Sequence, residues 1–295
     1  MIRPVNFSFN AETATNNAFQ VPGNDAGAQE KALHEFNEFV QTLSNNDIDV
    51  TVVDDTAEPY TPDSIFPNNW VSFHDDGTIC LYPMFAPNRR LERKPAVLQI
   101  INDKFKVIKK IDLSNYEDSN HFLEGTGSMV LDRENKIAYA CLSPRTDEKV
   151  LKVFCEQMRY KAVVFDAMDE KGNAIYHTNV MMCVADKYIV ICLDALPDKK
   201  EKEGVMAAIK NSGKEIIEIS LEQMNRFAGN MLQVNNKKDE KLLIMSTQAY
   251  ASLTSKQVMK LSSFNKIIHS SLATIETNGG GSARCMMAEV HLPER

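Results

Sequence analysis

The residue best suited to covalent chemistry in this sequence is Cys285. It follows Asn278-Gly279-Gly280-Gly281-Ser282-Ala283-Arg284 and precedes the apolar run Met286-Met287-Ala288. Three consecutive glycines allow a backbone to take unusual dihedral angles and to approach a ligand closely. The adjacent Arg284 is a cation, and a cation beside a thiol favours the nucleophilic thiolate. The pattern predicts a reactive cysteine between a glycine loop and a buried strand; the alternative is a buried cysteine that merely follows a turn.

Two further residues have the chemistry that such a cysteine needs. His177 stands in Tyr176-His177-Thr178-Asn179, and Glu124 stands in Leu123-Glu124-Gly125. A thiolate can attack an electrophilic carbon, and a histidine can protonate the departing nitrogen and then activate water. Glu124 could orient or charge-stabilise the histidine, or bind a substrate NH group. Taken singly, His177 could be a satisfied core histidine and Glu124 a solvated turn residue.

An internal repeat indicates how these residues are positioned. Short apolar segments separated by polar turns, each pair typical of a β-hairpin, start at residues 70, 128, 179, 230 and 285, and the fifth is cut short by the end of the chain. The spacings of 58, 51, 51 and 55 residues are typical of repeated units in a ring or array. A helical stretch and another strand follow each complete hairpin. Five such hairpin–helix–strand units predict an α/β, pseudo-symmetric five-bladed ring. Its hairpin starts would face one central pocket.

Other segments have clear local signals. Residues 1–24 are expected to be irregular, 27–45 helical and 48–53 a strand, from the spacing of their apolar residues. A helix is expected after Thr146, and strands are expected at 162–165 and 215–219. Ser220 to Gln223 and Thr254 to Gln257 both have the form of a capping box.

Composition limits the class of protein. The 295 residues contain 33 Lys and Arg against 40 Asp and Glu, a net charge of −7, which disfavours nucleic-acid binding. No apolar run approaches the roughly 18 residues that span a bilayer, and the first residues lack a signal-peptide pattern, so we expect no membrane partner and a cytoplasmic location. The six cysteines lack CxxC spacing and are expected to be reduced and buried. No metal site or other cofactor is expected, and residues 1–295 are expected to form one domain.

Several motifs resemble one enzyme superfamily. Gly279 to Met286 resembles the cysteine motif of arginine deiminases. Pro62-Asp63-Ser64-Ile65-Phe66, Arg89-Arg90 and Leu142 to Thr146 resemble dimethylarginine dimethylaminohydrolase. Arg3-Pro4, Phe7, Asn10 and residues 16–20 resemble a bacterial branch that includes citrulline-utilisation hydrolases, often described as amidinotransferases. These proteins belong to the guanidino-group-modifying superfamily, and the resemblance implies its fold, the five-bladed pentein propeller.

The resemblance also implies roles for individual residues. Cys285 would be the nucleophile, His177 the acid and base, and Glu124 its acidic partner. Arginine side chains would bind the substrate carboxylate, since a guanidinium fork suits a planar anion, although each could instead form a surface ion pair. The candidates for that role are Arg89 or Arg90, and Arg145. The remaining candidates for the substrate pocket are Asp63, Phe66, Asn68, Asn69, Asn179, Asn230 and Gly281.

The departures from the family pattern bear on the substrate. Relatives that bind a guanidinium place carboxylates where this chain has Asn68 and Asn69, and arginine deiminases carry an aspartate where it has Asn179. Neutral amides both donate and accept hydrogen bonds, and a buried cation without a counter-charge is costly. We therefore expect a neutral ureido substrate, with citrulline as the leading candidate. Attack by Cys285 would give a carbamoyl adduct, and then ornithine, carbon dioxide and ammonia.

Other functions stay open from the sequence alone. The same chemistry would serve a deiminase of arginine or dimethylarginine, or an amidinotransferase that excludes water in favour of an acceptor amine. A second alternative is a propeller that acts only as a binding scaffold. A papain-like protease is disfavoured, because the strand-rich repeat does not suit that fold and the histidine precedes the cysteine. A small amino acid is the expected partner, and the sequence leaves the oligomeric state open.

Overall fold

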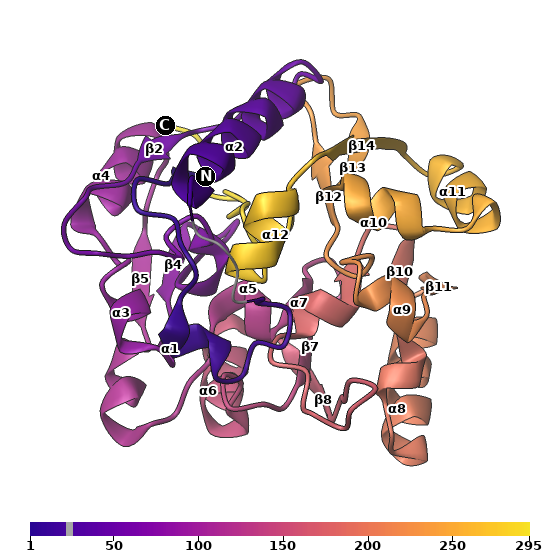
Figure 1. The fold of residues 1–295 in the computed structure, drawn as a ribbon. Helices are drawn as coiled ribbons and strands as arrows, with labels where there is room; N and C mark the ends of the chain where they lie inside the picture. The colour runs from indigo at the N-terminus through magenta and orange to yellow at the C-terminus, as the bar shows by residue number, and fades with distance from the viewer. Residues whose placement is uncertain (22–25) are drawn as a thin grey trace.

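The computed structural model describes residues 1–21 and 26–295 and has a mixed α/β fold built from small sheets (Figure 1). Four three-stranded sheets within these residues share one topology, in which an antiparallel pair is followed by a parallel third strand. Their strands are β3 (Val71–Phe73), β4 (Thr78–Leu81) and β5 (Lys109–Asp112); β6 (Val130–Asp132), β7 (Ile137–Cys141) and β8 (Lys161–Phe165); β9 (Met182–Val184), β10 (Tyr188–Ile191) and β11 (Glu215–Glu218); and β12 (Leu232–Asn235), β13 (Lys241–Ser246) and β14 (Lys266–Ser270). The four complete hairpins expected from the sequence are therefore present.

Helices make the connection to each parallel strand, because two parallel strands cannot be joined by a tight turn. They are α4 (Pro95–Lys104), α6 (Glu148–Met158), α8 (Lys199–Asn211), and the pair α10 (Thr247–Ser252) and α11 (Ser255–Ser262). In Figure 1 these helices lie around the outside of the molecule. The expected capping boxes are confirmed at α11 and at α9 (Leu221–Met224). Shorter helices are α3 (Pro87–Arg90), η2 (Ser114–Ser119) and η3 (Leu193–Ala195).

A short helical turn precedes the first strand of three sheets: η1 (Pro67–Asn69), α5 (Gly125–Ser128) and α7 (Thr178–Met181). The expected hairpin starts at residues 128 and 179 are therefore wrong, since both residues are helical and the hairpins begin at β6 and β9. Helix α5 packs against both η1 and α7, and α5 and α7 lie near the middle of the view in Figure 1. Gly125 allows this packing, because a Cβ there would lie 2.4 Å from the backbone oxygen of Asn68. The turns of successive units thus meet near the centre of the fold.

The fifth hairpin expected from the sequence is wrong. Residues 283–286 form a turn, in which the amide of Cys285 donates to the carbonyl of Ser282 at 3.0 Å, and the described residues after Cys285 form no strand. The chain instead returns to the first sheet, where the amide of Lys106 donates to the carbonyl of Pro293 at 2.8 Å. Leu292 is buried there in the core of that unit. Cys285 consequently lies on a turn between the glycine loop and this returning segment.

The N-terminal region closes the remaining side of the molecule. Helix α2 (Ala28–Ser44) matches the predicted helix and packs against α12 (Ala273–Gly279). The predicted strand at 48–53 is wrong. Only β2 (Val53–Asp54) is extended there, because its partner β1 (Ile2–Arg3) is just two residues long. Residues 1–21 include β1 and the short α1 (Ala11–Ala14), while residues 22–24 of the segment expected to be irregular lie outside the described residues.

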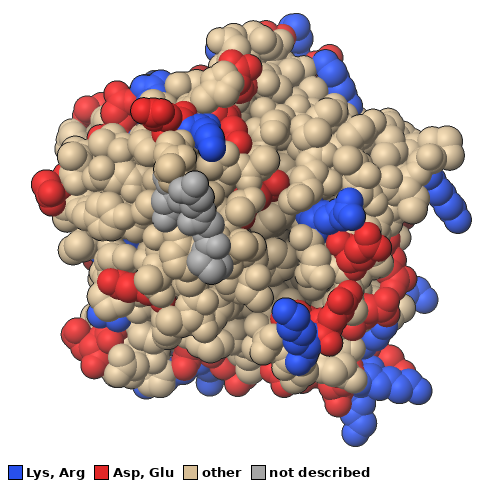
Figure 2. Space-filling model, viewed as in Figure 1, with Lys and Arg blue, Asp and Glu red and all other residues tan. Residues whose placement is uncertain are grey.

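The cysteines are buried, as expected from the sequence, and the surface has mixed charge. All six cysteines are free and buried. Basic and acidic side chains are interspersed on the face in Figure 2, mainly around its rim, with no continuous basic stripe. Over residues 1–21 and 26–295, no helix is long and apolar enough to cross a membrane.

Candidate active site

His177 and Glu124 form a buried pair at the centre of the fold. The Nε2 atom of His177 lies 2.8 Å from Oε2 of Glu124. His177 stands directly before α7, and Glu124 stands directly before α5, so the packing of these two turns brings the side chains together. Gly127 makes the approach possible, because a Cβ at that position would lie 2.8 Å from Nδ1 of His177.

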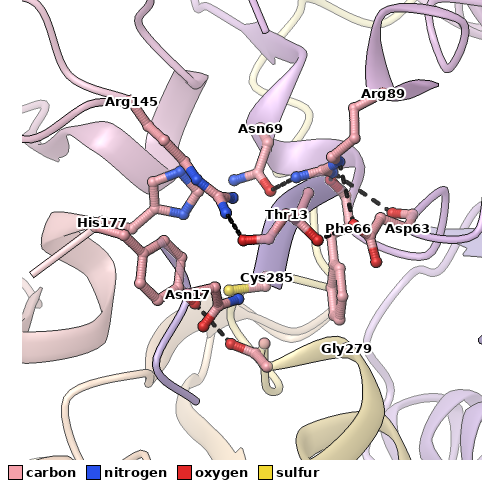
Figure 3. Close-up of a pocket in the computed structure, with 13 residues that line it drawn as sticks. Thr13, Asn17, Asp63, Phe66, Asn69, Arg89, Arg145, His177, Gly279 and Cys285 are labelled. Carbon is pink, nitrogen blue, oxygen red and sulfur yellow. Dashed lines mark hydrogen bonds and ion pairs between the residues drawn. The ribbon is translucent and has the colours of Figure 1, made fainter. Parts of the chain in front are cut away.

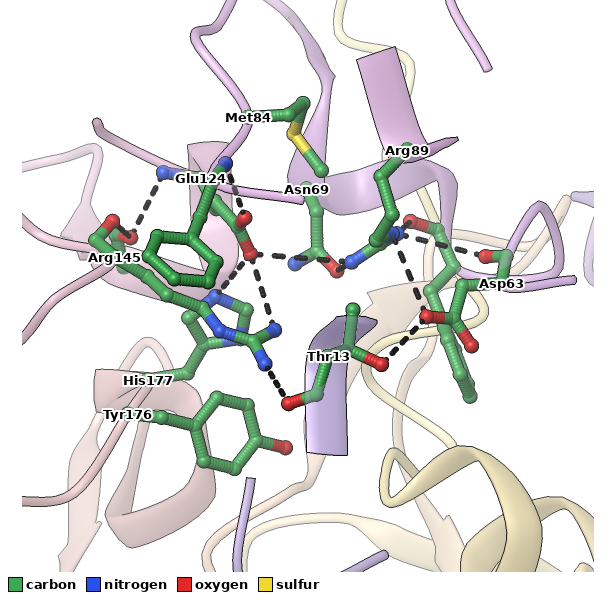
Figure 4. A network of polar contacts seen from close by, with 12 residues as sticks. Thr13, Asp63, Asn69, Met84, Arg89, Glu124, Arg145, Tyr176 and His177 are labelled. Atoms are coloured by element: carbon green, nitrogen blue, oxygen red, sulfur yellow. Dashed lines mark hydrogen bonds and ion pairs between the residues drawn. The ribbon is translucent and has the colours of Figure 1, made fainter. Parts of the chain in front are cut away.

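The charges around this pair determine its protonation. Burial disfavours the ionised carboxylate of Glu124, but Arg145, the hydrogen bond from His177 and Arg89 together hold the pKa of Glu124 well below its usual value. Burial lowers the pKa of His177 to about 4, although Glu124 opposes that shift. At neutral pH the imidazole is therefore neutral. Its Nε2–H donates to the carboxylate, which leaves Nδ1 as the atom able to accept a proton. Figure 4 shows this network.

The sulfur of Cys285 lies in a pocket beside this pair (Figure 3). The pocket is narrow, with a cavity volume of about 10 Å³, which is room for roughly one water molecule. Its lining comes from the N-terminal segment, from the turn regions that carry Asn69, His177 and Cys285, and from two arginines. The lining residues are Thr13, Asn17, Asp63, Phe66, Asn69, Arg89, Arg145, Tyr176, His177, Gly279, Gly280, Gly281 and Cys285.

Cys285 also contacts two amides outside this lining. The Nδ2 atoms of Asn179 and Asn230 donate to its sulfur at 3.4 and 3.3 Å. Both asparagines were expected to bind substrate, whereas the structure places them against the nucleophile. The guanidinium of Arg284 does not bond the sulfur, since it donates to the carbonyl of Met287 at 2.9 Å and lies 3.4 Å from Glu289.

Arg89 is held by a buried carboxylate. Its Nε and one Nη donate to the two carboxylate oxygens of Glu92 at 2.8 and 3.0 Å, which raises the pKa of Arg89 although burial opposes that shift. The other Nη donates to Oδ1 of Asn69 at 2.8 Å. Because a guanidinium only donates, the Asn69 amide must present its oxygen to Arg89. Its Nδ2 then has no hydrogen-bond partner among the described residues, although it is buried.

Arg145 has neutral partners from the N-terminal segment. It donates to the carbonyl of Thr13 at 2.6 Å and to Oδ1 of Asn16 at 2.7 Å, and it lies 3.5 Å from Oε2 of Glu124. Its guanidinium carbon lies 4.9 Å from the ring centroid of Tyr176, a cation–π contact. The guanidinium is therefore oriented over the pocket by groups that carry no charge of their own, apart from Glu124.

Asp63 supplies a carboxylate to the pocket. Its Oδ2 accepts hydrogen bonds from Nδ2 of Asn10 at 2.8 Å and from the hydroxyl of Thr13 at 3.1 Å. Its Oδ1 is buried and has no hydrogen-bond partner within residues 1–21 and 26–295. Burial raises the pKa of Asp63, although Arg89 and the two hydrogen bonds oppose that shift.

The glycine run packs tightly against the pocket wall. A Cβ at Gly279 would lie 2.8 Å from the ring of Phe66, and one at Gly281 would lie 2.9 Å from it. Gly280 has φ +63°, and its carbonyl accepts a hydrogen bond from the hydroxyl of Tyr176 at 2.6 Å. The glycines are thus needed for close packing of the loop that carries the cysteine.

Besides Asn179 and Asn230, two further candidates lie outside the pocket lining. The Nε atom of Arg90 donates to the carbonyl of Met84 at 3.0 Å, and its guanidinium lies 3.7 Å from Glu117, so it points away from the site. The arginines that line the pocket are Arg89 and Arg145. Asn68 is buried behind the lining, where its Nδ2 donates to the hydroxyl of Thr126 at 3.4 Å.

Sequence reasoning overlooked several residues of the site. Thr13 and Asn17 reach the pocket from the N-terminal segment, where residues 16–20 resemble the bacterial branch but were not expected to line the pocket. Glu92 was also missed, although its spacing of three residues from Arg89 on one chain segment is a signal for an ion pair. Over the described part of the chain, no group of three His, Cys, Asp or Glu side chains could hold a metal ion.

The chain was compared with known proteins. A model of the family described as N,N dimethylarginine dimethylhydrolase, eukaryotic, matches residues 3–292. No curated protein matched the sequence.

Three solved structures illustrate the similarity of fold. The N-terminal domain of ArgZ, an arginine dihydrolase from the ornithine-ammonia cycle in Cyanobacteria, has a TM-score of 0.78 and 18% identity in a substrate-bound mutant form, over 99% of this chain and 97% of that one. Unliganded AgrE has a TM-score of 0.79 and 18% identity over 100% of this chain, but over 39% of its own length. A dimethylarginine dimethylaminohydrolase adduct has a TM-score of 0.63 and 16% identity over 88% and 90% of the two chains. At these identities the structures establish a shared fold.

Proposed function

The chain belongs to the N,N dimethylarginine dimethylhydrolase family within the guanidino-group-modifying superfamily. We propose that it is a cysteine hydrolase, as this membership indicates, and that its substrate is a ureido amino acid, for a reason that lies in the pocket itself. Hydrolysis of a C–N bond other than a peptide bond is the chemistry of this family. Citrulline is the leading candidate for the substrate. Cys285 is the nucleophile, His177 the acid and base, and Glu124 the partner of His177.

One observation carries the ureido assignment: the direction of the Asn69 amide. Arg89 binds its oxygen, so the group that Asn69 offers to the pocket is an N–H donor without a partner among the described residues. A ureido group has a carbonyl oxygen that can accept this donor. A guanidinium ion has only N–H groups, so it would leave the buried donor unpaired and face it with a like partial charge.

The remaining pocket residues suit the α-amino-acid end of the substrate. Arg145 is the better candidate for the carboxylate, because its two shortest hydrogen bonds are to a carbonyl and an amide that an anion can replace, while Glu124 lies farther away at 3.5 Å. Arg89 is already paired with the carboxylate of Glu92. Oδ1 of Asp63, which no described residue binds, is the candidate for the α-ammonium group, whose positive charge would keep the carboxylate ionised.

These roles give a balanced reaction. The proton of the Cys285 thiol passes to Nδ1 of His177, and the sulfur attacks the ureido carbon. The C–N bond to the side chain breaks, His177 returns the proton to the departing amine, and ornithine leaves a carbamoyl group on the sulfur. His177 then takes a proton from water, which attacks the adduct and frees the thiol and carbamate; carbamate decomposes to carbon dioxide and ammonia. Glu124 stabilises the imidazolium in both steps.

We also propose that residues 1–295 form one pentein domain, a five-bladed α/β propeller. The four sheets of equal topology and the fifth turn at 283–286 support this arrangement. The fifth blade would lack a hairpin of its own.

A substrate panel tests the function. Purified chain and the Cys285→Ala variant are incubated with citrulline, arginine, agmatine and a methylated arginine, and ammonia and amino-acid products are measured. Ornithine from citrulline, lost in the variant, is the expected result. Turnover of arginine without turnover of citrulline would reject the ureido assignment and keep the nucleophile.

A second candidate is a guanidino hydrolase or deiminase, or an amidinotransferase. The description of the matched family, and a neighbouring structure of mutant AgrE with L-arginine at a TM-score of 0.77 and 17% identity, favour a guanidino substrate. Repeating the panel with and without an acceptor amine such as glycine separates a hydrolase from a transferase, because only the transferase needs the amine for turnover. A protein inactive under all of these conditions would instead fit a binding scaffold.

A further inference from the structure

Two side-chain amides from different units of the repeat converge on the sulfur of Cys285. Asn179 Nδ2 lies 3.4 Å and Asn230 Nδ2 lies 3.3 Å from Sγ, and all three side chains are buried. We propose that these amides hold Cys285 as a thiolate before substrate binds, so that the sulfur needs no cationic substrate to become nucleophilic. This inference rests on the proposed function for the role of Cys285 as the nucleophile, and the neutral ureido substrate gives it a rationale.

The orientation of Asn230 is determined by two partners besides the sulfur. Its Oδ1 accepts a hydrogen bond from the backbone amide of Arg284 at 3.0 Å, and a backbone amide can only donate. Its Nδ2 donates to the backbone carbonyl of Asn179 at 2.9 Å, and a carbonyl can only accept. The amide nitrogen must therefore be the atom that faces the sulfur.

Asn179 adds a second donor with a looser hold. Its Nδ2 donates to the sulfur, and its Oδ1 is buried with no hydrogen-bond partner among the described residues. Because no other described residue binds this side chain through a hydrogen bond, the sulfur is the group that orients it. The Asn230 amide is thus held in place by the backbone, and the Asn179 amide adds a second donor whose orientation depends on the sulfur.

Two N–H donors aimed at one sulfur stabilise its thiolate form more than its thiol form. A neutral thiol sulfur is a weak acceptor, whereas a thiolate is an anion and accepts strongly, so hydrogen bonds to sulfur favour the ionised form. The proton released on ionisation passes to Nδ1 of His177, where the negative charge on the sulfur favours the imidazolium, and His177 returns it to the departing amine. Arg284, which the sequence suggested for this purpose, is occupied by Met287 and Glu289.

Close packing of two turns brings the donors to the sulfur. Gly229 precedes Asn230, and a Cβ there would lie 2.2 Å from the backbone oxygen of Val180. Any larger residue would push the turn at 225–229 away from α7 and separate Asn230 from both Asn179 and Cys285. The glycine therefore contributes to the placement of the amides.

A neutral substrate explains why the protein would supply such donors. A guanidinium ion bound beside a sulfur favours the thiolate by its charge, whereas a ureido group has no charge to offer. An enzyme for a ureido substrate must ionise its cysteine with its own groups. Two neutral amides do so without placing a carboxylate next to the sulfur, which would oppose ionisation.

Alkylation of the free protein tests the inference without any substrate. The rate of modification of Cys285 by iodoacetamide is measured between pH 5 and 10 by peptide mass spectrometry, for the wild type and for Asn230→Ala and Asn179→Ala. The other thiols give little background, because burial raises their pKa to about 12 for Cys80, Cys141 and Cys183 and to about 11 for Cys155 and Cys192. Each variant should raise the midpoint of the pH profile by about one unit. Alkylation of Cys285 at pH 7 should then be about tenfold slower than in the wild type.

The controls separate this effect from general disruption. Asn265→Ala removes another buried amide, one that accepts from the hydroxyl of Tyr188 at 2.6 Å and does not line the pocket, and it should leave the midpoint unchanged. Asn179→Ala removes only the hydrogen bond to sulfur among those the described residues make with this side chain, so it decides the question if Asn230→Ala fails to fold. Variant midpoints equal to or below that of the wild type, or a wild-type midpoint at the ordinary thiol value of about 8.5, overturn the inference. Because iodoacetamide replaces the substrate, failure of the ureido assignment would not affect this result.

Discussion

The imidazole of His177 and the carboxylate of Glu124 lie 2.8 Å apart, and neither side chain is exposed to solvent. The carboxylate receives the Nε2–H of the ring, which determines the tautomer and turns Nδ1 into the acceptor. Arg145 and Arg89 lie 3.5 and 3.9 Å from the same carboxylate oxygen and keep it ionised. The four side chains form one electrostatic unit.

Replacement of Glu124 by glutamine should reduce kcat by at least about 100-fold, the lower range for loss of general acid–base catalysis. An amide cannot stabilise the imidazolium that forms when His177 holds a proton. Steady-state rates of ornithine release measure the effect. Glu117→Gln is the matched control, since Glu117 pairs with Arg93 outside the pocket at 2.6 Å and should retain activity. Equal rates for wild type and Glu124→Gln would remove Glu124 from the mechanism.

Replacement of Asn69 by aspartate should reverse the preference between ureido and guanidino substrates. The new carboxylate can accept from a guanidinium but cannot donate to a ureido oxygen, and loss of a donor to a buried substrate group costs about 1–3 kcal/mol. We expect kcat/KM for citrulline to fall at least about tenfold and the ratio of arginine to citrulline turnover to rise. Asn68→Asp is the control, because Asn68 lies behind the pocket lining. An unchanged ratio in Asn69→Asp would contradict the argument from amide direction.

Replacement of Arg145 by lysine should raise KM for the amino-acid substrate by roughly tenfold or more, because a lysine cannot form the two parallel bonds of a guanidinium fork. Arg90→Lys should leave KM unchanged, since its guanidinium donates to the carbonyls of Met84 and Phe85. Initial rates over a range of substrate concentrations separate KM from kcat. Equal KM values for the two variants would show that the carboxylate binds elsewhere.

Protonation of His177 should destabilise the folded protein as pH decreases from about 6.5 towards 4. Its pKa is lowered by burial to about 4 in the folded chain, so between these values the unfolded chain binds the extra proton and acid favours unfolding. Between pH 7 and pH 5 this one group accounts for about 2 kcal/mol of lost stability. Urea unfolding at the two pH values checks this. His177→Gln should lose about 2 kcal/mol less than the wild type over the same interval.

Other buried groups set the pH dependence that remains in this measurement. Burial raises the pKa of Glu92 and of Glu276 to about 7, so these carboxyls stabilise the folded chain as pH falls, whereas His74 acts in the same direction as His177. Burial lowers the pKa of His74 to about 3, and His74 is unchanged in the His177→Gln variant. The variant should therefore keep part of the pH dependence while losing the share due to His177. An identical pH dependence in the two proteins would mean that the folded His177 titrates normally.

Much of the fold could be predicted because the signals are local. Alternating apolar residues and polar turns define the hairpins at β3–β4 and β12–β13, and the apolar spacing over 27–45 defines α2. The expected strand at 48–53 has the same alternation but no long partner, so the pattern alone misled. The fifth hairpin failed for a related reason, since the chain after Cys285 binds the first unit instead of folding back on itself.

Cys285, His177 and Glu124 could be identified as candidates from the chain alone, because they recur at similar points of the repeat. Their partners could be identified only once the chain was folded. Thr13 reaches Arg145 across 132 residues, and Asn230 reaches Cys285 across 55. The direction of an amide and the partner of a guanidinium depend on such distant contacts. These distant contacts cannot be predicted from local sequence patterns, because they form only when separate turns pack against one another.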